Sequence, residues 1–257
     1  MLGRLVLHQA RYDLTGLLRN RQARYSTMLM PVVLLVALVS AFGDHVVGPG
    51  HVKASSYYVA GIATLAVLAA CFMNLVVSLT AQREAGVLKR RRTTPVPAHV
   101  LIAGRSLAAT ATAFATVAAV CLVGAAVFGV QPSPSALPSI PLTLLVASFA
   151  FCSIAYALAS FIRTADAAQP MVQAIALPLY FSSGVFIPSA SLPGWVSQAA
   201  SVLPVAHLSH ALHRSFEPAA HAGAFAWGDL AVLLAWGAGA LAVALSRFQW
   251  TPRSVQE

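Results

Sequence analysis

The chain has 257 residues, of which 58% are hydrophobic and only 9% are charged. A soluble globular domain usually has about 25% charged residues, so this composition excludes an ordinary soluble protein and indicates a membrane protein. The net charge of +9 would suggest a nucleic-acid partner in a soluble protein. In a membrane protein it is typical of basic cytoplasmic loops.

Six apolar stretches are candidates for membrane spans, because a spanning helix needs about 20 predominantly apolar residues. The predicted fold is an all-α integral membrane protein with a single transmembrane domain over residues 1–257. The expected parts are a cytoplasmic interfacial helix at 1–24, five spans within 25–187, an extracellular helical hairpin at 188–224, a sixth span at 225–246 and a cytoplasmic tail at 247–257. The six spans are expected at 25–42, 57–79, 106–130, 139–162, 169–187 and 225–246.

Lysine and arginine are distributed unevenly between the two sides that these spans define. Five precede the first span, six lie in or beside the loop between the second and third, one follows the fourth and two follow the sixth, fourteen on one side. The other side has only Lys53 and Arg214. Because cytoplasmic loops carry an excess of Lys and Arg, we expect both termini and the basic run at 89–92 to be cytoplasmic. Anchoring the topology is the minimum role of that run.

The N-terminal segment is amphipathic. Arg4 and Arg11 follow helical spacing on one face, while Leu7 and Leu14 lie on the opposite face. This pattern favours a helix lying in the membrane interface, the alternative being a simple cytoplasmic extension.

The outer segment at 188–224 contains signals for two short amphipathic helices, with Pro193 and Pro204 in their first turns. His207, His210 and His213 recur every three residues in the second of them. One interpretation is a metal site or a proton sensor. The other is that these are polar side chains on a water-exposed helix face, without a specific role. No carboxylate or cysteine joins these histidines at ligand spacing, so we expect no metal.

Recognisable catalytic motifs are missing from the sequence. It has no phosphate-binding loop, no H-E-x-x-H, no G-x-S-x-G and no paired-cysteine metal motif. No chain of acidic or histidine residues runs through the predicted spans, which argues against a proton- or sodium-coupled transporter. We therefore expect no catalytic residue and no bound cofactor in this chain, and any energy source would act through another chain. Candidate residues of a substrate pathway within the spans are Asn74, Gln173 and Phe181.

Two stretches carry a family resemblance. The loop after the second span reads QREAGVLKRRRTTPVPAHVLIAGR, and the exit of the fifth span reads SSGVFIPSASLPGWVSQAASVLPVAHLSHALHR. In register with six spans, they resemble the ABC-2 type membrane subunits of bacterial ABC exporters, in particular exporters of drugs and antibiotics. The first pattern is carried by Glu84, Gly86, Lys89, Thr94 and Pro95. The second is carried by Ser183, Gly184, Pro188, Pro193, Trp195, Pro204 and Arg214.

The resemblance implies a permease subunit in a bacterial cell membrane, paired with a second copy or a related permease. Separate ATPase subunits would bind ATP and Mg²⁺ and would receive the loop between the second and third spans. The substrate would be a hydrophobic or amphipathic molecule, such as a drug, an antibiotic or a lipid-linked compound, and it would be moved outward. The residues that the resemblance assigns to ATPase coupling are Arg83, Glu84, Gly86, Lys89, Arg90, Thr94 and Pro95. It assigns the second pattern to an outer hairpin or gate.

Two alternatives of a different class stay open at this point. A membrane scaffold or immunity-type protein without transport activity would show the same hydropathy. A membrane-embedded lipid-modifying enzyme would need acid, base or metal groups near a membrane face, and the only candidates are the three outer histidines.

Overall fold

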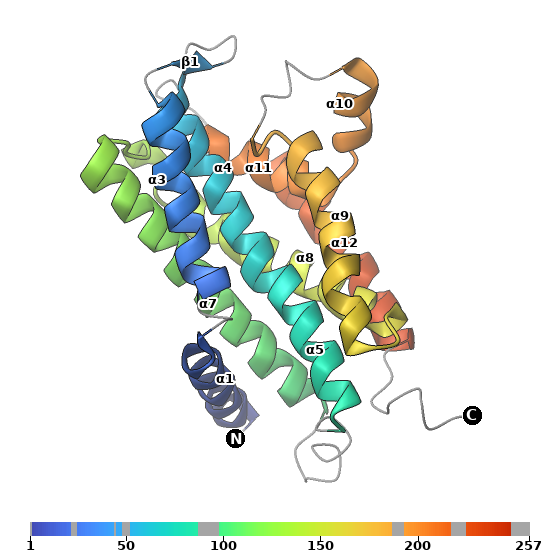
Figure 1. The fold of residues 1–257 in the computed structure, drawn as a ribbon. Helices are drawn as coiled ribbons and strands as arrows, with labels where there is room; N and C mark the ends of the chain where they lie inside the picture. Colours follow the sequence, from blue (N-terminus) through green and yellow to red (C-terminus); the bar gives the residue numbers. More distant parts are fainter. Residues whose placement is uncertain are drawn as a thin grey trace.

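The computed structural model describes residues 2–21, 25–43, 45–47, 52–86, 98–186, 193–216 and 225–247. Over these ranges the fold is a helical bundle, which confirms the all-α prediction for the body of the molecule. One short antiparallel pair, β1 (Val46–Val47) and β2 (Val52–Lys53), places Val46 opposite Lys53. It lies at one end of the bundle, between the first two long apolar helices (Figure 1).

The helical elements follow the predicted apolar stretches but are longer at several ends. In chain order they are α1 (Leu2–Arg19), η1 (Tyr25–Leu29), α3 (Met30–Phe42), α4 (Ala54–Leu68), η2 (Ala69–Met73), α5 (Asn74–Glu84), α7 (Ala98–Phe128), η3 (Pro134–Ala136), α8 (Ser139–Phe161), α9 (Ala165–Ser182), α10 (Gly194–Ala200), α11 (Pro204–Ser215) and α12 (Trp227–Arg247). The second helical run thus continues beyond the predicted span to Glu84, because charged residues end the apolar stretch without ending the helix.

Length and composition make four of the described helical runs candidate membrane spans. They are Ala54–Glu84, Val100–Phe128, Ser139–Phe161 and Trp227–Arg247, and the shorter apolar helix Thr27–Phe42 precedes them. α9 is not among these candidates because its mean hydropathy is too low, with Asp166, two glutamines and two internal prolines among its 18 residues. The prediction of six spans is therefore supported for four of them, and the first and fifth stay predictions.

The run Ala54–Glu84 forms the centre of the bundle. In its most apolar stretch of 18 residues, 67% of the residues are buried, whereas the same measure for Trp227–Arg247 is 22%. α3, α7 and α11 pack around α4, while α8 and α9 pack against α5. Between these two halves lies η2, a π-helical turn of a kind that often occurs at functional sites.

The amphipathic helix α1 packs along α7. A methyl group at Gly104 would lie 2.7 Å from Cβ of Gln9 and 3.1 Å from the carbonyl oxygen of Val6. Because glycine has no side chain, the two helices approach closely at this point. α1 lies at the same end of the bundle as the C-terminal end of α5, while β1 and α10 lie at the opposite end (Figure 1).

Candidate functional site

Arg83 is buried where the central helical run ends. It is 2% exposed, and its guanidinium donates to three backbone carbonyls near the end of α8. Nη1 donates to Ala159 at 2.9 Å, and Nη2 donates to Ile162 and, at 3.3 Å, to Arg163. The last carbonyls of a helix lack partners within the helix, so this arginine satisfies groups that α8 leaves open.

Glu84 is the next residue and contacts the next helix. Its Oε2 accepts a hydrogen bond from the backbone N–H of Ala165, the first residue of α9. Thr164 caps the same helix end by accepting from Ala167 at 3.4 Å. Two of the first free N–H groups of α9 therefore have acceptors, one of which comes from α5.

The two charges match the two helix ends that they contact. A helix carries partial negative charge at its C-terminus and partial positive charge at its N-terminus. α8 ends at Phe161 and α9 begins at Ala165, so opposite helix poles lie close together in the chain. The cation at position 83 meets the negative pole and the anion at position 84 meets the positive one. We call these contacts between α5 and residues 159–165 the inner junction.

The remaining predicted coupling residues lie beyond the end of α5. Gly86 ends the described part of this segment with a φ of 68°, a conformation that glycine adopts without strain. Lys89, Arg90, Thr94 and Pro95 fall outside the described residues. The structure thus places Arg83 and Glu84 against α8 and α9, a location that the sequence patterns did not predict.

A cavity of about 360 Å³ lies between α1, α5 and α7. Its lining includes the polar residues Asn74, Ser78, Gln82 and Arg105, together with Asp13 of α1, Asn20 just after α1 and apolar residues such as Ala70 and Ala108. Arg105 donates to Oε1 of Gln82 at 2.7 Å and to Oγ of Ser78 at 2.8 Å, which gives this part of the lining a polar, hydrogen-bonded surface. The cavity therefore combines polar and apolar surface in one space.

The other two residues predicted for a substrate pathway lie elsewhere. Gln173 is half-buried on α9, and Phe181 is 52% exposed near the end of the same helix. The ring of Phe181 lies 5.8 Å from that of Phe186. The structure does not bring Asn74, Gln173 and Phe181 together in one cavity.

The predicted outer pattern begins with a tight turn after α9. Gly184 has a φ of 74°, and its carbonyl accepts the hydroxyl hydrogen of Tyr57 from the start of α4. The carbonyl of Val185 contacts the backbone at Gly61, where any side chain would collide with it. Oγ of Ser183 is buried and has no hydrogen-bond partner among the described residues. The turn is thus fitted against the central helix.

The other predicted outer residues form the two short helices of the hairpin. Pro193 immediately precedes α10, and Trp195 in its first turn is 75% exposed. Pro204 starts α11, and Arg214 lies in the last turn of α11. The predicted start of the second helix at Pro204 is confirmed, whereas Pro193 lies just before α10 and not in its first turn. Pro188 falls outside the described residues.

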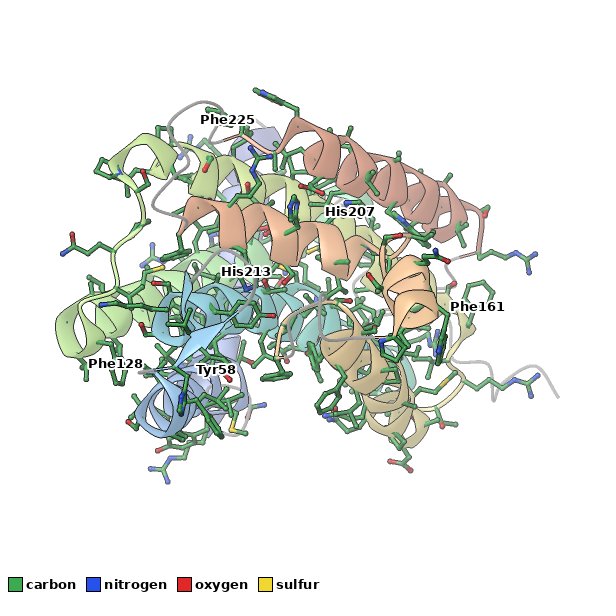
Figure 2. The ribbon with its side chains drawn as sticks, turned by 90° about the horizontal axis from the view of Figure 1, so that it is seen from above. Tyr58, Phe128, Phe161, His207, His213 and Phe225 are labelled. Atoms are coloured by element: carbon green, nitrogen blue, oxygen red, sulfur yellow. The ribbon has the colours of Figure 1, made fainter. Side chains whose placement is uncertain are left out.

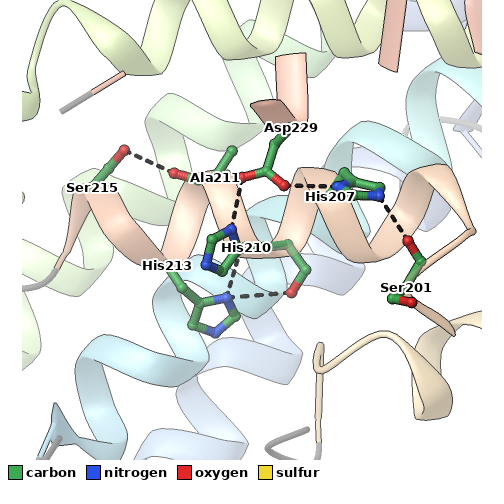
Figure 3. A network of polar contacts seen from close by, with 8 residues as sticks. Ser201, His207, His210, Ala211, His213, Ser215 and Asp229 are labelled. Carbon is green, nitrogen blue, oxygen red and sulfur yellow. Dashed lines mark hydrogen bonds and ion pairs between the residues drawn. The ribbon is translucent and has the colours of Figure 1, made fainter. Parts of the chain in front are cut away.

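A polar network joins α11 to the first turn of α12 (Figure 3). Nδ1 of His207 and Nδ1 of His210 each lie 2.7 Å from an oxygen of Asp229, whose side chain is 13% exposed. Nε2 of His207 lies 2.8 Å from the carbonyl oxygen of Ser201. Both partners of His207 are acceptors, so its ring makes both contacts only as the imidazolium cation. Within the described residues, no group of three metal-binding side chains is arranged to hold a metal ion.

His213 lies on the opposite side of α11 from His207, toward α4 (Figure 2). Its ring is 4.4 Å from that of Tyr57, and its Nδ1 lies 2.7 Å from the carbonyl oxygen of Ser209. The pKa of His213 is lowered from 6.5 to about 4, chiefly by burial and to a smaller extent by the nearby His210. The neutral ring therefore donates from Nδ1 and presents Nε2 as an acceptor, which has no partner among the described residues.

Sequence reasoning missed the pairing of these histidines with Asp229 and the contact between His213 and Tyr57. A signal was present, because the spacing of three residues places His207 and His210 on neighbouring positions of one helix face. The sequence alone did not show that α12 would begin beside that face.

A family model described as ABC-2 type transporter matches residues 7–216. A comparison with curated proteins found no match. The matched region begins inside α1 and ends just after α11, so it includes the inner junction, the cavity and the two short helices α10 and α11. It covers well over half of the sequence, and the chain therefore belongs to the ABC-2 type transporter family.

Proposed function

We propose that this chain is the membrane-spanning subunit of a bacterial exporter that moves a hydrophobic or amphipathic molecule outward. Membership of the ABC-2 family makes it a permease component of an ABC transporter, and such components pair with an ABC ATPase. In the proposed complex, ATP and Mg²⁺ bind to the separate ATPase subunit. A second copy of this chain or a related permease completes the membrane part.

The family match over residues 7–216 carries this proposal. Two further features support it. The sequence has no phosphate-binding loop of its own, and fourteen of its sixteen basic residues fall on one side of the predicted spans. A permease that receives its energy from a cytoplasmic ATPase accounts for both. The proposed topology has six spans and two cytoplasmic termini.

The ATPase-facing part is proposed to be the segment that follows α5, from Gly86 through Lys89, Arg90, Thr94 and Pro95. The inner junction supports this placement, because it fixes the start of that segment against α8 and α9. The outer gate is proposed to be the turn at Ser183 and Gly184 together with α10 and α11.

The cavity between α1, α5 and α7 supports an amphipathic substrate. Its volume of about 360 Å³ lies within the usual range for small-molecule sites. Its lining mixes polar and apolar residues, so one ligand could present a polar and an apolar part. On this proposal Asn74 contacts substrate in the cavity, while Gln173 and Phe181 contact it at a different stage along α9.

The test is co-expression and purification of the chain with candidate ABC ATPases from the same genome. The expected result is a stable complex whose ATPase activity requires both polypeptides. A Lys→Ala change in the phosphate-binding loop of the ATPase should abolish hydrolysis without separating the subunits. Hydrolysis of ATP by the purified chain alone would contradict the proposal.

A further inference from the structure

The end of α5 contacts two other helices through side chains of opposite charge. Arg83 donates to the carbonyls of Ala159, Ile162 and Arg163, and Glu84 accepts from the N–H of Ala165. The partners on α8 and α9 are backbone groups, and none of these contacts requires a particular side chain on those helices.

Burial makes the arginine contacts hard to exchange for water. At 2% exposure the guanidinium cannot keep a hydration shell if the carbonyls move away from it. An unpaired buried charge is strongly disfavoured. A displacement of α5 relative to α8 would therefore be unfavourable, because it would expose the guanidinium or leave it without its carbonyl acceptors. Movement of α5 together with α8 preserves all the bonds.

We propose that Arg83 and Glu84 are positioning residues that hold the end of α5 against the end of α8 and the start of α9. We call this connection the lock. The segment after Gly86 then displaces α5, α8 and α9 as one body. This inference rests on the proposed function for its consequence in transport, whereas the lock itself is a property of this chain alone. On this account Glu84 acts through α9 and not by pairing with a basic residue of the ATPase.

The first test measures the lock directly, without an ATPase. Spin labels are attached at Ala85→Cys and Asp166→Cys after Cys71, Cys121 and Cys152 are replaced by alanine, and their distance distribution is recorded by pulsed EPR in lipid nanodiscs. The expected result is a narrow distribution that Arg83→Ala broadens. The matched control Arg163→Ala removes an arginine of the same junction whose backbone carbonyl, not its side chain, makes the contact.

The distribution should stay narrow in this control. A distribution that is equally narrow in Arg83→Ala, or equally broad in Arg163→Ala, would overturn the lock. Arg83→Lys serves as the second variant, because an ammonium group keeps the charge but cannot span separate carbonyls as a guanidinium does. It should give a distribution between those of the parent and Arg83→Ala.

The second test separates capping from direct ATPase contact at Glu84. The readout is substrate transported per ATP hydrolysed in liposomes containing the chain and its ATPase, with a fluorescent amphipathic dye as substrate. Glu84→Ala should lower this ratio by about tenfold, and Glu84→Gln should stay within about twofold, because an amide oxygen still accepts from the N–H of Ala165. Asp166→Ala removes an exposed acid in the first turn of α9 and should behave like the parent.

The outcomes separate the two proposals. If Glu84→Gln fails as completely as Glu84→Ala, acceptance of the hydrogen bond from Ala165 is not sufficient, and the proposal that Glu84 acts as this acceptor is overturned. If the parent chain transports nothing with any ATPase, the proposed function fails, while the spin-label distances still decide whether the lock exists.

Discussion

His207 and His213 lie on one short helix, and their hydrogen bonds require different protonation states. His207 contacts a carboxylate and a carbonyl, so it completes both bonds only as a cation. His213 is buried against Tyr57, where the neutral ring is favoured. Protonation of His213 therefore weakens the packing of α11 against α4.

The burial of His213 predicts a loss of stability in acid. Above pH 6.5 the ring is neutral in both folded and unfolded chains, so its burial does not make the free energy of unfolding depend on pH. As the pH falls from 6.5 to 4, the unfolded chain takes up a proton that the folded chain excludes, so the free energy of unfolding falls. The loss is at most about 3 kcal/mol. Chemical unfolding of the purified protein in lipid, followed across this pH range, measures it.

The control for this prediction is His213→Gln, which cannot titrate. Its free energy of unfolding should depend less on pH than that of the parent between pH 6.5 and 4. Parallel curves for the two proteins would show that His213 does not contribute.

At the scale of helices, apolar length and proline positions allowed most elements to be predicted. The start of α11 followed from Pro204, because proline suits the first turn of a helix, whereas Pro193 precedes α10 by one residue. The contacts between elements were not predictable. The sequence predicted Arg83 and Glu84 to be part of a loop, because they follow the end of an apolar run. Their partners are backbone groups about 80 residues away in the sequence. Backbone groups carry no sequence signature, so no pattern could have indicated the inner junction.

The close approach of α1 and α7 at Gly104 predicts that a larger residue there will separate them. Gly104→Leu would force its side chain into Gln9 and toward the carbonyl oxygen of Val6, at a cost of about 1–3 kcal/mol. The expected result is faster tryptic cleavage at Arg4 and Arg11 as α1 leaves the bundle. Gly239→Leu is the matched control, since no described atom lies within 4 Å of a methyl group at that position. Equal cleavage rates in the two variants would contradict this account of α1.

At the scale of the whole molecule, the two ends of the bundle are formed by different structural elements. The inner junction and α1 lie at one end, and the strands, α10 and α11 lie at the other (Figure 1). The weak apolarity of α9 makes its crossing one of two that are still predictions, and α9 connects the inner junction to the outer turn.

Single cysteines labelled with a membrane-impermeant maleimide test this crossing. In intact cells Lys53→Cys and Trp195→Cys should react, whereas Ala85→Cys and Arg163→Cys should react only after the membrane is permeabilised. Reaction of Arg163→Cys and Trp195→Cys from the same side would show that α9 does not cross the membrane.

The most direct test of the central claim is transport by the reconstituted complex. Inside-out vesicles containing this chain and its ABC ATPase are supplied with ATP, Mg²⁺ and a fluorescent amphipathic dye, and accumulation of the dye is followed. The account predicts uptake that requires ATP hydrolysis and both polypeptides, and that is lost when the ATPase carries an inactive phosphate-binding loop. Uptake that proceeds equally well with the inactive ATPase, or no ATP-dependent movement of any amphipathic dye or lipid, would contradict it.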